Sequence, residues 1–258
     1  MLIDVHAHLC DEKLKEFKKE IISDSLNDLP SRIIDTGSSM ETSICAYENA
    51  VSNERIFCAV GVHPEFADKV KSDDYDRLSL MWQNEKTVAI GEIGLDYHYE
   101  NNPPREIQKR VFCEQLELAY SLKAPAVIHI RDAFGDAYSL MEENSSKLYY
   151  GTLIHCYGGS KEMSMRFNKF DSYYSFGGVI TFKNAKEKPD IIRNIPLNRL
   201  LIETDCPYMT PEPYRGRMNF PKHVKLVAKR LAEIIGRQQE ETEDITAENA
   251  FRLFGKLK

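Results

Sequence analysis

Leu2-Ile3-Asp4-Val5-His6, at the start of the chain, is a short apolar run that ends in a histidine. Further short runs rich in apolar residues follow it at Arg32–Thr36, Ile56–Gly61, Val88–Glu92, Ala126–His129, Gly151–His155, Tyr173–Phe176 and Leu200–Glu203. Such runs, alternating with longer amphipathic stretches, are typical of βα units around a parallel sheet. Eight of them predict an α/β fold, a (β/α)8 TIM barrel, in a single domain over residues 1–258. An open doubly wound sheet would carry a glycine-rich phosphate loop after its first strand, and the sequence has none there.

Three stretches between or after the runs predict helices by the spacing of their apolar residues. The first covers Arg105–Leu122, and the second covers His223–Ile235 and stops at Gly236. The third is a short last helix over Asn249–Phe254, with Thr246 as its N-cap.

Composition restricts the classes of protein to which the chain can belong. The net charge of −6 argues against a basic groove for duplex DNA, although metal ions and a few local arginines can reverse the sign inside a pocket. No apolar run is long enough to span a membrane, and no leader sequence precedes the first strand, so we expect a cytoplasmic protein without a membrane partner. The six cysteines show no paired spacing such as C-x-x-C and are expected to be reduced thiols. Nothing in the sequence indicates an obligate protein partner.

Polar residues that can bind metal stand where the predicted strands end. His6, Glu92, His129 and His155 each end a run, and Asp205 lies two residues beyond another. Since the strand ends of a TIM barrel meet at one mouth, these residues are expected to come together at an active site there. His8 lies two residues after His6, so both imidazoles face one side of the strand.

This mixed set of imidazoles and carboxylates predicts two divalent metal ions, because one tetrahedral ion needs fewer ligands. The ligands suit zinc, manganese, iron or nickel better than calcium, and Mg remains among the ions considered. We expect Glu92 to bridge the ions, with His6 and His8 on the first and His129 and His155 on the second. Asp205 is then expected near the first ion, as the base that activates water.

Several other residues near the strand ends have candidate roles. His63 is expected to contact substrate and to take part in catalysis, and Arg131 and Arg215 are expected to bind a substrate phosphate. Arg131 has the alternative of a salt bridge with Asp132. Two cysteines follow predicted ligands, and strand alternation is expected to turn both away from the site: Cys156 and Cys206. His98 and His223 are expected to be ordinary surface or capping residues.

The chain resembles the TatD family of metal-dependent hydrolases, which are often described as deoxyribonucleases. The matching segments run in order through nearly the whole chain: Asp4–His8, Gly61–Pro64, Ala89–Tyr97, Val127–Ala133, Ile154–Gly159, Gly177–Phe182, Leu201–Tyr208, Arg215–Pro221 and Asn249–Phe254. The metal ligands that the resemblance implies are His6, His8, Glu92, His129, His155 and Asp205. It also implies a cytosolic phosphodiesterase with DNA as its usual substrate.

The expected function is therefore a two-metal phosphodiesterase that acts as a 3'-5' DNA exonuclease on single strands or strand ends. Two cations would lower the pKa of a water and offset charge on the phosphate. One alternative is a two-metal amide or ester hydrolase, such as an aminoacyl-tRNA deacylase, because the same centre polarises a carbonyl group. Another is a non-enzymatic, metal-bound binding module.

Overall fold

The computed structural model describes residues 1–22 and 30–257, in which eight parallel strands form one nearly closed barrel. The strands are β1 (Ile3–Ala7), β2 (Arg32–Thr36), β3 (Ile56–Val60), β4 (Thr87–Asp96), β5 (Ala126–Arg131), β6 (Thr152–Ile154), β7 (Tyr173–Phe176) and β8 (Leu200–Ile202). Each strand pairs with the next in chain order. Between the ends of β1 and β8, the amide of Asp205 donates to the carbonyl of His6 at 2.9 Å. The predicted TIM barrel is confirmed.

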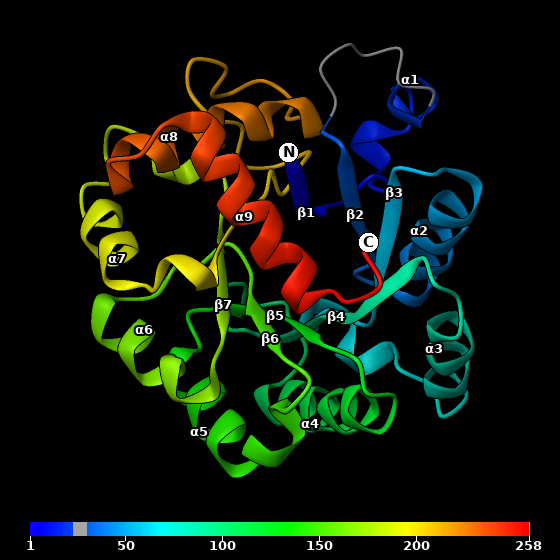
Figure 1. Ribbon diagram of the computed structural model, residues 1–258. Coiled ribbons are helices and arrows are strands. Elements are labelled where there is room, and N and C mark those ends of the chain that lie inside the picture. Colours follow the sequence, from blue (N-terminus) through cyan, green and yellow to red (C-terminus); the bar gives the residue numbers. More distant parts are fainter. Residues whose placement is uncertain (23–29, 258) are drawn as a thin grey trace.

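Helices surround the strands, as Figure 1 shows. They are α1 (Lys18–Ile22), α2 (Met40–Ser52), α3 (Asp74–Trp82), α4 (Arg105–Ser121), α5 (Phe134–Glu143), α6 (Lys161–Phe167), α7 (Lys188–Asn194), α8 (Val224–Ile235) and α9 (Gln239–Leu253). The first two predicted helices are confirmed as α4 and α8, and α8 ends at Gly236 with a φ of 71°.

The prediction for the last helix was wrong about its start. α9 begins at Gln239, and Thr246, the expected N-cap, lies inside it and donates to the carbonyl of Thr242 at 3.0 Å. Residues 239–244 include no apolar side chain, so the apolar periodicity begins later than the helix does.

The interior of the barrel has an apolar lower part and a polar upper part. Near the strand starts, inward side chains pack with α9 in one buried cluster, which includes Val127, Leu153, Tyr173, Leu201, Ala250, Leu253 and Phe254. Two residues further along the same strands stand His129, His155, Ser175 and Glu203, which face the same way because strand side chains alternate. α9 crosses the N-terminal end of the barrel (Figure 1). The polar positions are therefore left near the C-terminal mouth.

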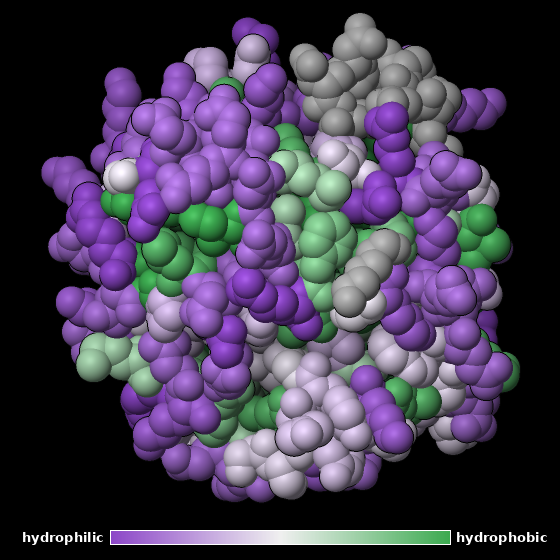
Figure 2. All heavy atoms as spheres, in the orientation of Figure 1, coloured by the Kyte–Doolittle hydropathy of each residue, from purple (hydrophilic) through white to green (hydrophobic). Residues whose placement is uncertain are grey.

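The face that α9 crosses is mainly hydrophilic on its outer surface, with apolar patches between the polar side chains (Figure 2). A second and larger buried cluster lies between strands and outer helices, with members such as Phe112, Phe167, Ile192 and Leu231. Within the described ranges, no helix has the length and apolar character needed to cross a bilayer.

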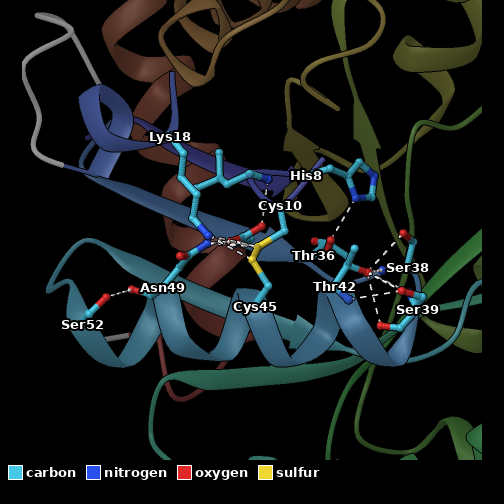
Figure 3. Close-up of a disulfide and its surroundings, with 12 residues drawn as sticks. His8, Cys10, Lys18, Thr36, Ser38, Ser39, Thr42, Cys45, Asn49 and Ser52 are labelled. Carbon is cyan, nitrogen blue, oxygen red and sulfur yellow. Dashed lines mark hydrogen bonds between the residues drawn. A yellow bond between two sulfur atoms is a disulfide. The ribbon is translucent and has the colours of Figure 1, made fainter. Parts of the chain in front are cut away.

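Cys10 and Cys45 form a disulfide, so the expectation that all six cysteines are reduced was wrong for this pair (Figure 3). Cys10 lies in the loop after β1, and Cys45 lies on α2, which follows the neighbouring strand β2. Their separation of 35 residues matches no cysteine motif, so only the barrel topology brings them together. The free cysteines are Cys58, Cys113, Cys156 and Cys206.

Candidate metal centre

The structure brings all the predicted metal ligands together at the C-terminal mouth of the barrel. His6 lies on β1, Glu92 lies on β4 and His129 lies on β5. The remaining ligands follow strands directly or within three residues: His8 after β1, His155 after β6 and Asp205 after β8.

Glu92 lies at the centre of the cluster, and its two carboxylate oxygens face different histidines. Oε1 lies 2.8 Å from His129 Nδ1 and 2.7 Å from His155 Nε2. Oε2 lies 3.5 Å from His6 Nε2 and 3.6 Å from His8 Nε2. A carboxylate placed in this way can bridge two cations, each of which is also held by a pair of imidazoles.

Asp205 lies beside the pair formed by His6 and His8. Its Oδ1 lies 3.3 Å from His8 Nε2 and 3.9 Å from His6 Nε2. The backbone of Asp205 has a φ of 54°, a left-handed conformation that aspartate tolerates better than most residues. This turn directs the carboxylate toward the cluster instead of continuing β8.

The electrostatics of the cluster favour positive charge. Burial alone would raise the pKa of Glu92, but the charge of His155 and hydrogen bonds from His129 and His155 hold that pKa well below its usual value. Burial alone would lower the pKa of His8, but a hydrogen bond to Asp205 and the charge of Glu92 raise it to about 9. Without metal, protons on His8, His129 and His155, whose pKa values are raised, supply the positive charge that the carboxylates attract. The mixed nitrogen and oxygen donors therefore fit divalent transition metals.

Asp96 also belongs to the cluster, although the sequence did not predict it. Its Oδ2 lies 3.1 Å from His129 Nε2, on the side of the ring opposite Glu92. Gln108 of α4 holds the backbone of Asp96, since its amide donates to the carbonyl of Asp96 at 2.9 Å and accepts from its amide N–H at 2.9 Å. Asp96 lies four residues after Glu92 on the same strand, and this same-face spacing was the available signal.

Gly94, between Glu92 and Asp96, allows β4 and β5 to approach each other closely. Its φ is 142°, and a Cβ at this position would overlap the carbonyl oxygen of His129. A side chain here would push His129 away from Glu92.

The backbone of β2 fixes the orientation of His8. The carbonyl oxygen of Thr36 lies 2.9 Å from His8 Nδ1 (Figure 3).

A cavity of about 710 Å³ opens above the ligands, and His63 lines it. The Nδ1 of His63 accepts a hydrogen bond from the amide of Glu65 at 3.2 Å, and its Nε2 lies 3.7 Å from Glu92 Oε1. Burial lowers the pKa of His63 to about 3. The ring is therefore neutral at pH 7 and carries its hydrogen on Nε2, on the side of Glu92.

Arg131 also lines the cavity. Its guanidinium lies over the ring of Tyr99, 5.0 Å from the centroid, and donates to the Tyr99 hydroxyl at 3.3 Å. Asp132, the alternative partner of Arg131, pairs instead with His98 Nδ1 at 2.8 Å. Arg215 lies outside the cavity lining that the described residues form, with its guanidinium 4.1 Å from the centroid of the Phe182 ring.

Two further cavity residues were not foreseen. Lys188, at the start of α7, lines the cavity and donates to the carbonyl of Tyr157 at 2.9 Å. Cys156 lines it as well, contrary to the expectation that it points away, because its φ of 43° interrupts the strand alternation. Cys206 is buried, as expected of a structural cysteine. His223 is buried and is the N-cap residue of α8, so it is a capping residue and not a surface one.

Comparison with known proteins gives consistent results along the whole chain. The family model described as TatD related DNase matches residues 3–255. The uncharacterized metal-dependent hydrolase YabD of Bacillus subtilis (strain 168) is 41% identical over 254 residues, which cover 98% of this chain and 99% of YabD. The uncharacterized metal-dependent hydrolase YcfH of Escherichia coli (strain K12) is 32% identical over 259 residues, which cover 98% and 95%. The crystal structure of YJJV, a TatD homolog from Escherichia coli k12, is 26% identical, covers 98% of both chains and superposes with a TM-score of 0.90.

Proposed function

We propose that this chain, which belongs to the family of TatD related DNases, is a two-metal phosphodiesterase that removes nucleotides from DNA in the 3'-5' direction. The chain is a metal-dependent hydrolase. One observation supports the proposed phosphodiesterase activity more than any other. Glu92 lies between two pairs of histidines on the floor of a cavity that Arg131 and Lys188 also line.

The ligand geometry divides the residues between two ions. His6, His8 and Asp205 would hold one ion, His129 and His155 would hold the other, and Glu92 would contact both. When bound, divalent cations supply Lewis acidity, which lowers the pKa of a water and offsets charge on a phosphate.

The chain's own groups have separate roles in this reaction. Asp205 accepts the proton of the attacking water. Its carboxylate is ionised and free to do so, because a hydrogen bond from His8 holds its pKa below the usual value despite burial. The water oxygen bonds to phosphorus and the bond from phosphorus to the 3' oxygen breaks. The proton that Asp205 has accepted passes to the 3' oxygen, so the shortened strand leaves with a 3' hydroxyl and the released nucleotide keeps the phosphate. The Nε2–H of His63 donates to a phosphate oxygen, and the cations Arg131 and Lys188 hold the phosphates of the strand.

The shape and charge of the molecule favour strand ends as substrate. The cavity of about 710 Å³ lies within the range of sites that enclose small ligands, and it is not a long groove. A single strand end can enter such a cavity, whereas the middle of a duplex cannot. The net charge of −6 also gives no general attraction for duplex DNA.

The test is nuclease activity of metal-stripped protein reconstituted with Mg²⁺, Mn²⁺ or Zn²⁺. The substrates are single-stranded DNA labelled at its 5' or its 3' end, and a closed single-stranded circle. Glu92→Ala and Asp205→Ala remove a ligand, and Glu248→Ala, an exposed carboxylate on α9, is the matched control. We expect a ladder from the 5'-labelled strand, an intact circle, full activity of the control and no activity of the ligand variants.

Two results would contradict the proposal. Equal degradation by wild type and both ligand variants would show a contaminating nuclease. An inert wild-type protein that binds metal would rule out the nuclease function, and the same preparation would then be tested on aminoacyl esters and small amides.

A further inference from the structure

Behind the metal ligands lies a group of buried polar atoms that the proposed reaction does not use. His6 Nδ1, His155 Nδ1 and Glu203 Oε1 have no hydrogen-bond partner among the described residues. Ligand atoms of these three residues lie within 4.8 Å of one another, and Glu203 is completely buried directly after β8. Three buried atoms without partners, on residues whose ligand atoms lie this close together, require a physical explanation.

The two imidazoles lie parallel and present the same edges to the same neighbours. The rings of His6 and His155 stack with centroids 3.9 Å apart and planes 7° apart. Both direct Nε2 toward Glu92, at 3.5 Å for His6 and 2.7 Å for His155. On the far edge, His155 Nδ1 lies 3.6 Å from Glu203 Oε1.

Glu203 itself is held in place from a neighbouring strand. The hydroxyl of Ser175, buried on β7, donates to Glu203 Oε2 at 2.5 Å. Oε1 therefore remains as the free acceptor on the side of the imidazoles.

The chemistry of imidazole makes this acceptor necessary. A neutral imidazole has one nitrogen with a lone pair, and its other nitrogen carries a hydrogen. When Nε2 of His6 and of His155 offers its lone pair to the metal cavity, each Nδ1 becomes a buried N–H donor. Outer partners that accept from the distal nitrogen of a metal-binding histidine typically change metal affinity by 10- to 100-fold.

We propose that Glu203 is a positioning residue that orients one histidine of each of the two predicted ion sites. It accepts from the Nδ1–H of His155 and of His6, and so presents both Nε2 lone pairs to the cavity. Asp96, in contrast, is hydrogen-bonded to one predicted ligand, His129, and so serves a single site. The inference rests on the ion sites of the proposed function, and it adds that one buried carboxylate couples the two sites.

The test is calorimetric titration of metal-stripped protein with Mn²⁺ and with Zn²⁺. The variants are Glu203→Gln, Glu203→Ala and Ser175→Ala, with Asp96→Asn as the comparison that removes an outer carboxylate from one site only. We expect Glu203→Gln to weaken both ions by about tenfold, Glu203→Ala to weaken both by up to about 100-fold, and Asp96→Asn to weaken one. Ser175→Ala should give a smaller loss at both sites. The isosteric glutamine variant, checked by circular dichroism, keeps the test valid if the alanine variant does not fold.

A second measurement reads the proposed role directly. Proton and nitrogen-15 spectra of the Zn²⁺-loaded protein should show the Nδ1–H signals of His6 and His155 at low field in the wild type and shifted upfield in Glu203→Gln, and a merely structural role of Glu203 would leave these signals unmoved. Wild-type affinity for both ions in Glu203→Gln, or Nδ1–H signals of His6 and His155 that do not move in this variant, would overturn this inference alone. A wild-type protein that binds no ion would overturn the proposed function with it.

Discussion

At the scale of single residues, Lys188 shows how the cavity departs from the overall acidity of the chain. Its ammonium lines the cavity and donates one hydrogen bond to the carbonyl of Tyr157 at 2.9 Å. Burial lowers the pKa of Lys188, which means that its charge is partly desolvated. An anionic group in the cavity would compensate the ammonium of Lys188 for this lost solvation, so Lys188 is suited to bind a phosphate.

We expect Lys188→Ala to raise the KM for single-stranded DNA about tenfold, equivalent to about 1.4 kcal/mol, with little change in kcat. The reason is that Lys188 binds a phosphate without touching the reacting atoms. Steady-state kinetics measures both constants, and Lys186→Ala, an exposed lysine just before α7, is the matched control. If the two variants have the same KM, Lys188 has no role in binding.

Residues whose role depends on strand ends could be located from the sequence, and residues whose role depends on a neighbouring element could not. His129 and His155 end apolar runs, so the barrel alone determines where they meet. Lys188 comes after an irregular connection, and nothing in its local pattern separates it from Lys183 or Lys186. The sequence placed Glu203 at the end of a strand but did not predict its role, because its partners come from β1, β6 and β7.

At the scale of elements, the disulfide joins the loop after β1 to α2. Lys18 Nζ lies 3.0 Å from Cys45 Sγ, and Asn49 of α2 donates to Asp35 on β2 at 2.8 Å (Figure 3). The loop that carries Cys10 is therefore attached both covalently and by polar contacts, two residues after the ligand His8.

Removing this link with Cys45→Ser should lower the free energy of unfolding by about 3–4 kcal/mol, because the disulfide closes a long loop in the unfolded chain. Urea denaturation of metal-free protein without reductant measures the change, and Cys113→Ser, a free cysteine, is the control. Thiol titration of the unfolded wild type should detect only Cys58, Cys113, Cys156 and Cys206. Six reactive thiols would contradict the presence of the disulfide.

The connection before α8 contains a buried histidine that makes stability depend on pH. His223 Nδ1 lies 2.9 Å from Asn219 Oδ1, and the ring stacks on Tyr214 with centroids 5.1 Å apart. Burial, with a smaller effect of Lys222, lowers the pKa of His223 from 6.5 to about 4. Between these values the unfolded chain binds a proton that the folded protein does not.

The contribution of His223 to stability is therefore complete above pH 6.5 and is lost as the pH falls toward 4. In the metal-free protein, His223→Gln should reduce the loss of unfolding free energy between pH 7 and pH 5. Urea denaturation at the two pH values compares variant and wild type, so that the titration of the metal-site histidines cancels. Identical losses in both proteins would show that His223 titrates normally.

At the scale of the whole molecule, the barrel has a different chemistry at each end. The N-terminal end is apolar and covered by α9, and the C-terminal mouth carries the ligands and the cavity. The eight-strand pattern was enough to predict this architecture, because the alternation of apolar runs and amphipathic stretches extends over the full chain. It did not predict that α9 covers the lower end, since the first turns of α9 are polar and its contacts reach strands from both ends of the chain, β1 and β8.

Phe254→Ala should lower the free energy of unfolding by about 3–5 kcal/mol, since the ring is completely buried beneath the barrel. Metal affinity should stay within about twofold of the wild type, because the ligands lie at the opposite end. Urea denaturation and Mn²⁺ titration measure the two effects, with Phe251→Ala, a less buried ring of the same helix, as control. A large loss of metal affinity with unchanged stability would contradict this division between the two ends.

The covering of the barrel by α9 also has a consequence for protein synthesis. Ile3 and Val5 of β1 share their buried cluster with Ala250 and Phe254. A ribosome makes the N-terminal residues first, so the underside of β1 stays open to water until the codons for residues 239–257 have been translated. Release of the nascent chain and complete burial of its first strand must therefore come close together in time.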